Sequence, residues 1–271
     1  MSADIGERKL NAVERLGAFV LAVIEDLGGY TKFTSAAVWG IIRPPYRGRL
    51  LFKQMEFVGN QSLSIVMITG AFTGMVFAVQ SDFAFGRFGA RGLLGSTVTL
   101  ALTRELAPVL TALMVNGRVG SAMAAELGTM RVTEQIDALE SMAIDPIQYL
   151  ASPRVAASIL MVPILCAMFD IVGVFGVSYV ATEMLGVNPG PFYDRMQWFV
   201  DPDDIWGGMM KASIFGFILS SMGCYRGFFA RGGAEGVGQA TTRAVVASGV
   251  AVLVVDYFIT LILAPMSVNR A

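Results

Sequence analysis

The 271-residue sequence contains no histidine and only two cysteines, and both shortages limit the chemistry that it can perform. Histidine is the commonest general base and the commonest metal ligand in proteins. Cys166 and Cys224 stand alone in separate apolar runs, which predicts buried thiols rather than a disulfide framework or a zinc site. We therefore expect no catalytic residues and no metal site in this chain.

Motifs that bind nucleotides are missing as well. The chain has no Gly-Lys-Ser/Thr string and so no P-loop for ATP, and it has neither the GxSxG nor the HExxH motif of hydrolases. The glycines at 232, 233, 236 and 238 follow an apolar run rather than a strand, so they predict a flexible turn and not a dinucleotide site. A net charge of −1 gives no reason to expect nucleic acid as a partner.

Long apolar segments dominate what the sequence does contain. Hydrophobic residues make up 55% of the chain and charged residues only 15%, and the charges are bunched between apolar runs, as in a polytopic membrane protein. Gly70 and Gly74 form a GxxxG motif that predicts close helix contact, and Gly117, Gly120 and Ala124 suggest another. We predict an all-α membrane protein in which 56–271 form the transmembrane domain. Runs able to cross a ~30 Å hydrocarbon core lie at about 60–80, 93–125, 155–182, 205–225 and 244–265.

The first 55 residues predict an amphipathic region that lies along the membrane surface. Apolar residues recur at helical spacing from Leu10 to Leu27, and 30–43 repeat this pattern more weakly, with Trp39 as an interface anchor. Pro44-Pro45 breaks the helix before the first span. The segment lacks the uninterrupted apolar core of a signal peptide.

Basic residues indicate the orientation. A cytoplasmic N-terminus places most lysines and arginines on the cytoplasmic side and leaves only Arg87, Arg91, Arg195 and Arg270 clearly outside. The positive-inside rule favours this arrangement. Because five spans put the two termini on opposite sides, the C-terminus is then periplasmic, and the charged segment after the second span is cytoplasmic.

The charged segment 126–153 predicts a short helix that has one face suited to binding a partner protein. Thr133 is a suitable N-cap and Asp145-Pro146 a suitable end, which gives a helix of about three turns. An interfacial helix resting on lipid headgroups is the alternative, although such helices usually have a basic polar face. The apolar stripe consists of Ile136, Leu139 and Ala143 with Met142 beside them, and the acidic face carries Glu134, Asp137 and Glu140.

Five charged residues lie inside the apolar runs: Arg104, Glu105, Asp170, Lys211 and Asp256. Each costs about 2.5–3.5 kcal/mol on insertion scales, so each must either pair or line a wet cavity. Pairing of Arg104 with Asp170 or of Lys211 with Asp256 competes with a polar lining for an amphipathic substrate, and for Asp170 and Asp256 pairing is favoured. Arg243 begins the fifth span, where it can snorkel or bind a lipid phosphate.

Several ordered strings resemble the MlaE/YrbE permeases that accompany MCE-domain proteins. The resemblance covers nearly the whole chain and is weakest before Pro44. It implies a homodimeric permease of an ABC-type transporter in the bacterial inner membrane. The strings are RELAP at 104–108, RVGSAMAAELG at 118–128, EQIDALESMAIDP at 134–146, GAEGVG at 233–238 and ATTR at 240–243.

The resemblance also implies partners and sites. A phospholipid or similar lipid is expected in a cavity between the two copies, near Arg104, Glu105, Lys211 and Arg243. An MCE-domain protein, as an oligomeric ring, is expected on the periplasmic side. No cofactor is expected in this chain; ATP and Mg²⁺ belong to a separate cytoplasmic ABC ATPase. The ATPase would dock on the short cytoplasmic helix, through Glu134, Ile136, Asp137, Leu139, Glu140 and Met142.

Two other classes of function compete with a permease. An ion-coupled secondary carrier for an amphipathic substrate would need a relay of ionisable groups across an internal repeat. Asp170 and Asp256 offer such groups, but the two halves of the sequence show no convincing repeat. A lipid-modifying membrane enzyme would need clustered carboxylates or a nucleophile with its base, and the chain offers neither.

Overall fold

The computed structural model describes residues 12–44 and 47–268, and these are helical with no β-strand. The predicted all-α class is therefore confirmed. The predictions that concern Leu10, Pro45 and Arg270 lie outside the described residues.

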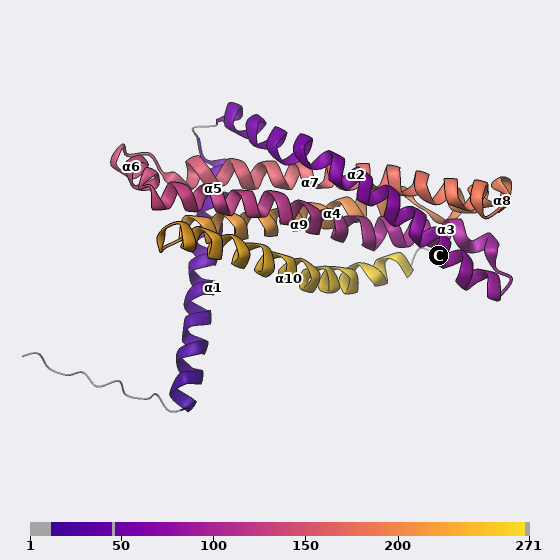
Figure 1. Cartoon of the computed structure of the whole chain (residues 1–271), viewed down its shortest axis with the longest axis horizontal. Coiled ribbons are helices and arrows are strands. Elements are labelled where there is room, and N and C mark those ends of the chain that lie inside the picture. The colour runs from indigo at the N-terminus through magenta and orange to yellow at the C-terminus, as the bar shows by residue number, and fades with distance from the viewer. Residues whose placement is uncertain (1–11, 45–46, 269–271) are drawn as a thin grey trace, which may run out of the picture.

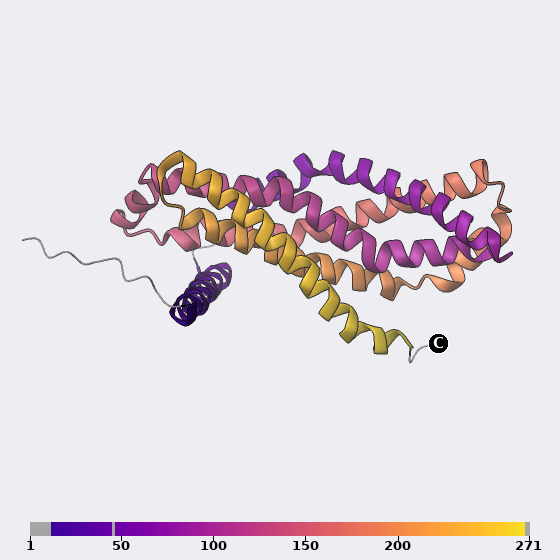
Figure 2. The same ribbon diagram turned by 60° about the horizontal axis from the view of Figure 1, so that its bottom comes forward.

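Five helices are long and apolar enough to cross a membrane, as predicted. They lie side by side as an elongated bundle (Figures 1 and 2), in which α7 packs against α2 and α9, and α10 packs against α9 and α5. Most of them begin earlier and end later than the apolar runs. The spans are α2 (Gly48–Arg87); η1 (Arg91–Leu93) with α3 (Leu94–Ala101), η2 (Leu102–Leu106), α4 (Ala107–Val115), η3 (Asn116–Gly120) and α5 (Ser121–Val132); η4 (Ile147–Ala151) with α7 (Ser152–Tyr179) and η5 (Val180–Met184); α9 (Pro202–Phe228); and α10 (Gly233–Val268).

Helix α1 (Ala12–Ile42) runs across the bundle rather than along it (Figure 1). The amphipathic pattern predicted up to Leu27 and its weaker repeat over 30–43 belong to this one continuous helix. Its C-terminal half is anchored by Phe33 and Ala37, which are buried, whereas Leu21 and Ile24 in its other half are exposed. This is the arrangement of a helix that lies in the plane of the membrane beside a spanning bundle.

Small residues bring the spanning helices into backbone contact. A Cβ on Gly74 would collide with the Gly173 carbonyl, and one on Gly70 would lie 3.0 Å from the Phe169 carbonyl oxygen. The close contact predicted from this GxxxG motif is confirmed. Gly120 and Ala124 lie against glycines of α9. The same prediction was wrong for Gly117, whose Cβ position is open.

The second span contains two π-turns, η2 and η3, of the kind that often accompanies functional residues in membrane and soluble helices. Pro108, the second residue of α4, has no N–H to donate to the Arg104 carbonyl four residues earlier. That carbonyl instead accepts a hydrogen bond from Lys211. The proline thus leaves a free acceptor inside the bundle.

Two short helices cap opposite ends of the bundle (Figure 1). Helix α6 (Gln135–Ser141) lies at the end where α5 and α7 meet, and α8 (Pro189–Phe199) lies at the other. Trp198 in α8 and Trp206 at the start of α9 are both exposed at this second end, where tryptophan suits a membrane interface.

The glycine-rich turn is shorter than predicted. Gly232 and Gly233 have φ values of 94° and 67°, which side chains rarely adopt, and they reverse the chain into α10. Gly236 and Gly238 are already helical.

Candidate functional site

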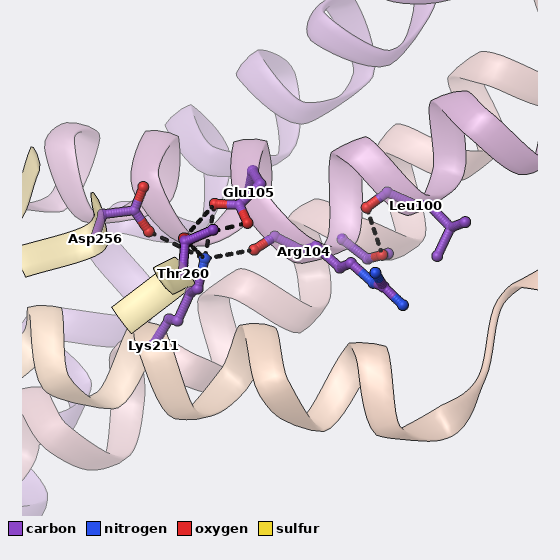
Figure 3. A network of polar contacts seen from close by, with 7 residues as sticks. Leu100, Arg104, Glu105, Lys211, Asp256 and Thr260 are labelled. Atoms are coloured by element: carbon purple, nitrogen blue, oxygen red, sulfur yellow. Dashed lines mark hydrogen bonds and ion pairs between the residues drawn. The ribbon is translucent and has the colours of Figure 1, made fainter. Parts of the chain in front are cut away.

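A buried lysine organises the polar residues in the half of the bundle nearer α8. The Lys211 ammonium on α9 lies 2.7 Å from the Glu105 carboxylate of η2, 2.7 Å from the Thr260 hydroxyl and 3.2 Å from the Asp256 carboxylate, both on α10. It also donates to the Arg104 carbonyl at 3.1 Å. Figure 3 shows these side chains converging from three elements. Lys211 therefore ties η2, α9 and α10 together.

Burial makes this arrangement energetically demanding. The Lys211 side chain is only 3% exposed, while the Glu105 side chain is 42% exposed. An ammonium has three protons, and the Glu105 carboxylate, the Thr260 hydroxyl and the Arg104 carbonyl accept them, while Asp256 is an ion-pair neighbour. Two carboxylates face one ammonium, so the cluster carries surplus negative charge, and the exposed Glu105 is its accessible member. The predicted pairing of Lys211 with Asp256 is confirmed, and Glu105 joins the pair.

Arg104 points away from this cluster, toward the start of α9 (Figure 3). Its guanidinium donates to Asp204 through Nη2 at 2.6 Å and Nε at 2.8 Å. Asp204 is held in turn by a capping box with Asp201. Adjacent residues on a helix project about 100° apart, which explains why Arg104 and Glu105 have different surroundings. The predicted pairing of Arg104 with Asp170 is wrong.

Asp170 lies alone on α7. It is 7% exposed, and neither carboxylate oxygen has a hydrogen-bond partner among the described residues. The favoured expectation that Asp170 pairs with a cation is therefore wrong: no lysine or arginine within 12–44 and 47–268 forms an ion pair with it.

Arg243 does not join the other predicted lipid contacts. It is exposed and lies seventeen residues before Thr260 on α10, which is about 25 Å along the helix. With Glu235 and Gln239 it lines an open hollow at the end of the bundle nearer α6. Any lipid contact of Arg243 is thus separate from the Lys211 cluster.

The short helix α6 differs from its prediction in both bounds. Thr133 does not cap it: Thr133 ends α5, and its hydroxyl donates back to the Thr129 carbonyl. Glu134 precedes α6 in a left-handed conformation with φ of 59°. The helix has seven residues, about two turns rather than three, and ends at Ser141. The Asp145 carboxylate instead accepts the N–H groups of the next helical segment.

The predicted stripe of α6 is divided: Ile136 and Leu139 face the protein itself, whereas Met142 and Ala143 are exposed. Ile136 is fully buried and Leu139 packs against the same core, so Ile136 anchors the helix and cannot present its side chain to a partner. Asp137 is exposed but forms an ion pair with Arg131 at 2.6 Å. The outer face of α6 consists of Glu134, Asp137, Glu140 and Met142, all of them exposed.

Sequence reasoning did not find Asp204 and Thr260. Thr260 follows Asp256 by four residues, so both lie on one face of a helix, and this spacing was an available signal. Asp204 sits in an ordinary helix start, DPDD, which gives no hint of a partner 100 residues away.

Beside the cluster, α10 presents an apolar face. Its C-terminal half diverges from the bundle (Figure 2). The exposed large apolar residues on α10 are Val246, Val250, Leu253, Val254, Tyr257, Phe258, Leu261 and Ile262. The Lys211 cluster therefore borders an uncovered apolar surface.

Comparisons with known proteins agree with one another. The family model described as Permease MlaE matches residues 51–262. A "Probable ABC transporter permease protein" of Rickettsia bellii is 43% identical over 251 residues, 93% of this chain and 97% of the relative. The "Intermembrane phospholipid transport system permease protein MlaE" of Haemophilus influenzae is 38% identical over 257 residues, 94% and 98% of the two chains. "Protein TRIGALACTOSYLDIACYLGLYCEROL 1, chloroplastic" of Arabidopsis thaliana is 39% identical over 220 residues, 81% and 63% of the two chains.

Proposed function

The chain belongs to the MlaE permease family, and from this we propose that it moves phospholipids or similar lipids between a bacterial inner membrane and an MCE-domain partner, driven by a separate ATPase. The observation that carries the proposal is the Lys211 cluster beside the apolar face of α10. A lipid needs a mostly apolar site with a few placed polar groups. The exposed parts of Arg104 and Glu105 offer those polar groups.

A second copy of the chain would complete the site. The exposed apolar side chains of α10 follow one another at helical spacing over about four turns. Two such faces, related by a two-fold axis, would enclose a space with a polar cluster on each side. The lipid would then lie between the two copies, with its headgroup near Glu105 and Arg104. Arg243, which faces the other end of α10, would contact a lipid phosphate there or the membrane surface.

The ATPase is proposed to dock on α6. The exposed acidic residues Glu134, Asp137 and Glu140 would face basic residues of the partner, with Met142 as an apolar contact. Leu139, partly buried, would support this surface from below. ATP and Mg²⁺ would bind in that partner, since this chain has no P-loop. The end of the bundle that carries α6 would be cytoplasmic, and the α8 end would face the periplasm and the MCE-domain ring.

In the proposed cycle, ATP-driven movement of α6 alternately widens and closes the space between the two copies. Closure would press the lipid against the cluster, and widening would release it. Lys211 would hold η2, α9 and α10 together throughout, because it projects from α9 and its ammonium donates hydrogen bonds to η2 and to α10.

The test is native mass spectrometry of the complex extracted gently from membranes, with the chain carrying its own partners. We expect two copies of the chain, an ATPase, MCE-domain subunits and bound phospholipid. Glu105→Gln should lose bound lipid, whereas the matched control Glu56→Gln, an exposed carboxylate on α2, should keep it. ATP-independent transport by the chain alone, with no ATPase recovered, would support the secondary carrier instead.

A further inference from the structure

An ion pair with a buried cation lies outside the Lys211 cluster. The side chain of Arg154, near the start of α7, is only 4% exposed, and its Nη2 lies 2.9 Å from the Glu126 carboxylate of α5. Its Nη1 donates to the Leu150 carbonyl at 2.6 Å. Glu126 itself is half exposed. A cation this deeply buried needs acceptor groups within hydrogen-bond distance.

The pair joins the two stems of the segment that carries α6. Glu126 lies in α5, on the N-terminal side of α6. Arg154 is the third residue of α7, on the C-terminal side of α6. The segment between them is fastened to the same core, since Ile136 packs in one buried cluster with Leu127 and Leu150. Glu126 and Arg154 are therefore the charged contact that bridges the base of this segment; we call the pair the Glu126–Arg154 strut.

Local geometry explains why an arginine occupies position 154. The π-turn η4 departs from the regular helical hydrogen-bond pattern, and the Arg154 guanidinium donates to its Leu150 carbonyl. A planar guanidinium can do this and still reach Glu126, because its donors point in several fixed directions. The residue after this turn is attached to α1, since the hydroxyl of Ser152, the first residue of α7, donates to the Ala37 carbonyl at 2.8 Å.

Above the strut, the segment has two points at which it can bend. Glu134 and Ala143 flank α6 and both have positive φ values, 59° and 58°. Non-glycine residues in this conformation are strained and are held there by their surroundings. Without a rigid base, a displacement of α6 would be absorbed at these two positions.

We propose that Glu126 and Arg154 are positioning residues for coupling: the strut makes α5 and α7 move as one body when a partner displaces α6. This inference rests on the proposed docking of an ATPase on α6. The helical rod from Glu126 back to Glu105 is twenty-one residues, about 31 Å, so a movement at the strut reaches the Lys211 cluster through one continuous span. The strut thus connects the docking end of the chain to the polar cluster.

The experiment uses the whole complex in liposomes of phosphatidylethanolamine and phosphatidylglycerol. Glu126→Gln replaces the carboxylate by an amide of the same shape that can still accept one hydrogen bond from Arg154. We expect this variant to keep the ATPase bound and to keep basal hydrolysis, while stimulation of hydrolysis by lipid and transfer of a fluorescent phospholipid fall by about tenfold, within the range of coupling between sites. Glu56→Gln, which changes an exposed carboxylate on α2, is the matched control and should behave like the unmodified complex.

A second variant keeps the test decisive if Glu126→Gln impairs folding. The reciprocal exchange Glu126→Arg with Arg154→Glu restores opposite charges, and it should recover part of the lipid stimulation that Glu126→Gln loses. Full coupling in Glu126→Gln, or an exchange that folds and binds the ATPase but recovers no lipid stimulation, would overturn the strut while leaving the proposed function intact. If the unmodified chain retains no ATPase, the proposed function fails and the strut with it.

Discussion

The Lys211 ammonium lies 2.7 Å from the Glu105 carboxylate, although the two residues are 106 positions apart and on different spans. The contact depends on Pro108, which removes the regular donor to the Arg104 carbonyl, and on the π-turn η2, which presents Glu105 toward α9. The two residues at this contact have different roles. Lys211 is buried and structural, while Glu105 is half exposed and able to meet a ligand.

Removing the two members of this contact should have unequal effects. Lys211→Met leaves Glu105 and Asp256 close together without a cation, and we expect it to lower the free energy of unfolding by about 3 kcal/mol. Glu105→Gln leaves Lys211 with Asp256, Thr260 and the Arg104 carbonyl, so its cost should be about 1 kcal/mol or less. Thermal unfolding in detergent measures both. Equal losses would show that Glu105 is as structural as Lys211.

Two neighbouring glycines of α9 offer a matched test of packing around the cluster. A Cβ on Gly208 would collide with the Thr103 carbonyl of η2, whereas Gly207 has open space at its Cβ position. Gly208→Ala should push α9 away from η2, cost about 1–3 kcal/mol and weaken lipid binding. Gly207→Ala should be neutral or slightly stabilising, by up to about 1 kcal/mol. Unfolding curves and lipid retention of the two variants provide the comparison, and similar curves would contradict the packing described here.

Reversing charge on the outer face of α6 should weaken docking of the ATPase. Glu134→Lys combined with Glu140→Lys changes two exposed residues that have no ion-pair partner among the described residues. Each charge reversal at a complementary interface costs of the order of 1 kcal/mol or more, so the affinity should fall by at least about tenfold. Pull-down of the ATPase at two salt concentrations measures this. Glu235→Lys, at the same end but away from α6, is the control, and equal retention by both proteins would refute the docking surface.

The apolar face of α10 should meet its own copy. Val254 is half exposed and Val252 is fully buried, two residues apart on the same helix. In a chain whose two native cysteines are replaced, Val254→Cys should form an intermolecular disulfide under mild oxidation, since a two-fold interface brings equivalent residues together. Val252→Cys should not. A monomer at both positions, under conditions that preserve transport, would rule out a dimer formed through this face.

The number of spanning helices, the absence of a P-loop and the close packing at Gly70 and Gly74 were all predictable from the sequence. Each depends on a local property: the length of an apolar run, a short motif, or small residues four positions apart. The pairing of Lys211 with Asp256 was also predictable, because two opposite charges inside spans must find partners.

Tertiary structure decided the rest. Arg104 pairs with Asp204 rather than Asp170, Ile136 turns inward, and Glu126 reaches Arg154. These choices depend on how far each helix is rotated about its axis and shifted along its neighbours. Thr133 is a local example of a residue whose role the sequence does not determine. Its side chain suits an N-cap, but α5 continues to Val132 and Thr133 is the C-cap of that helix. A run of apolar residues determines that a helix spans the membrane, but only packing against the other helices determines which of its faces meets which partner.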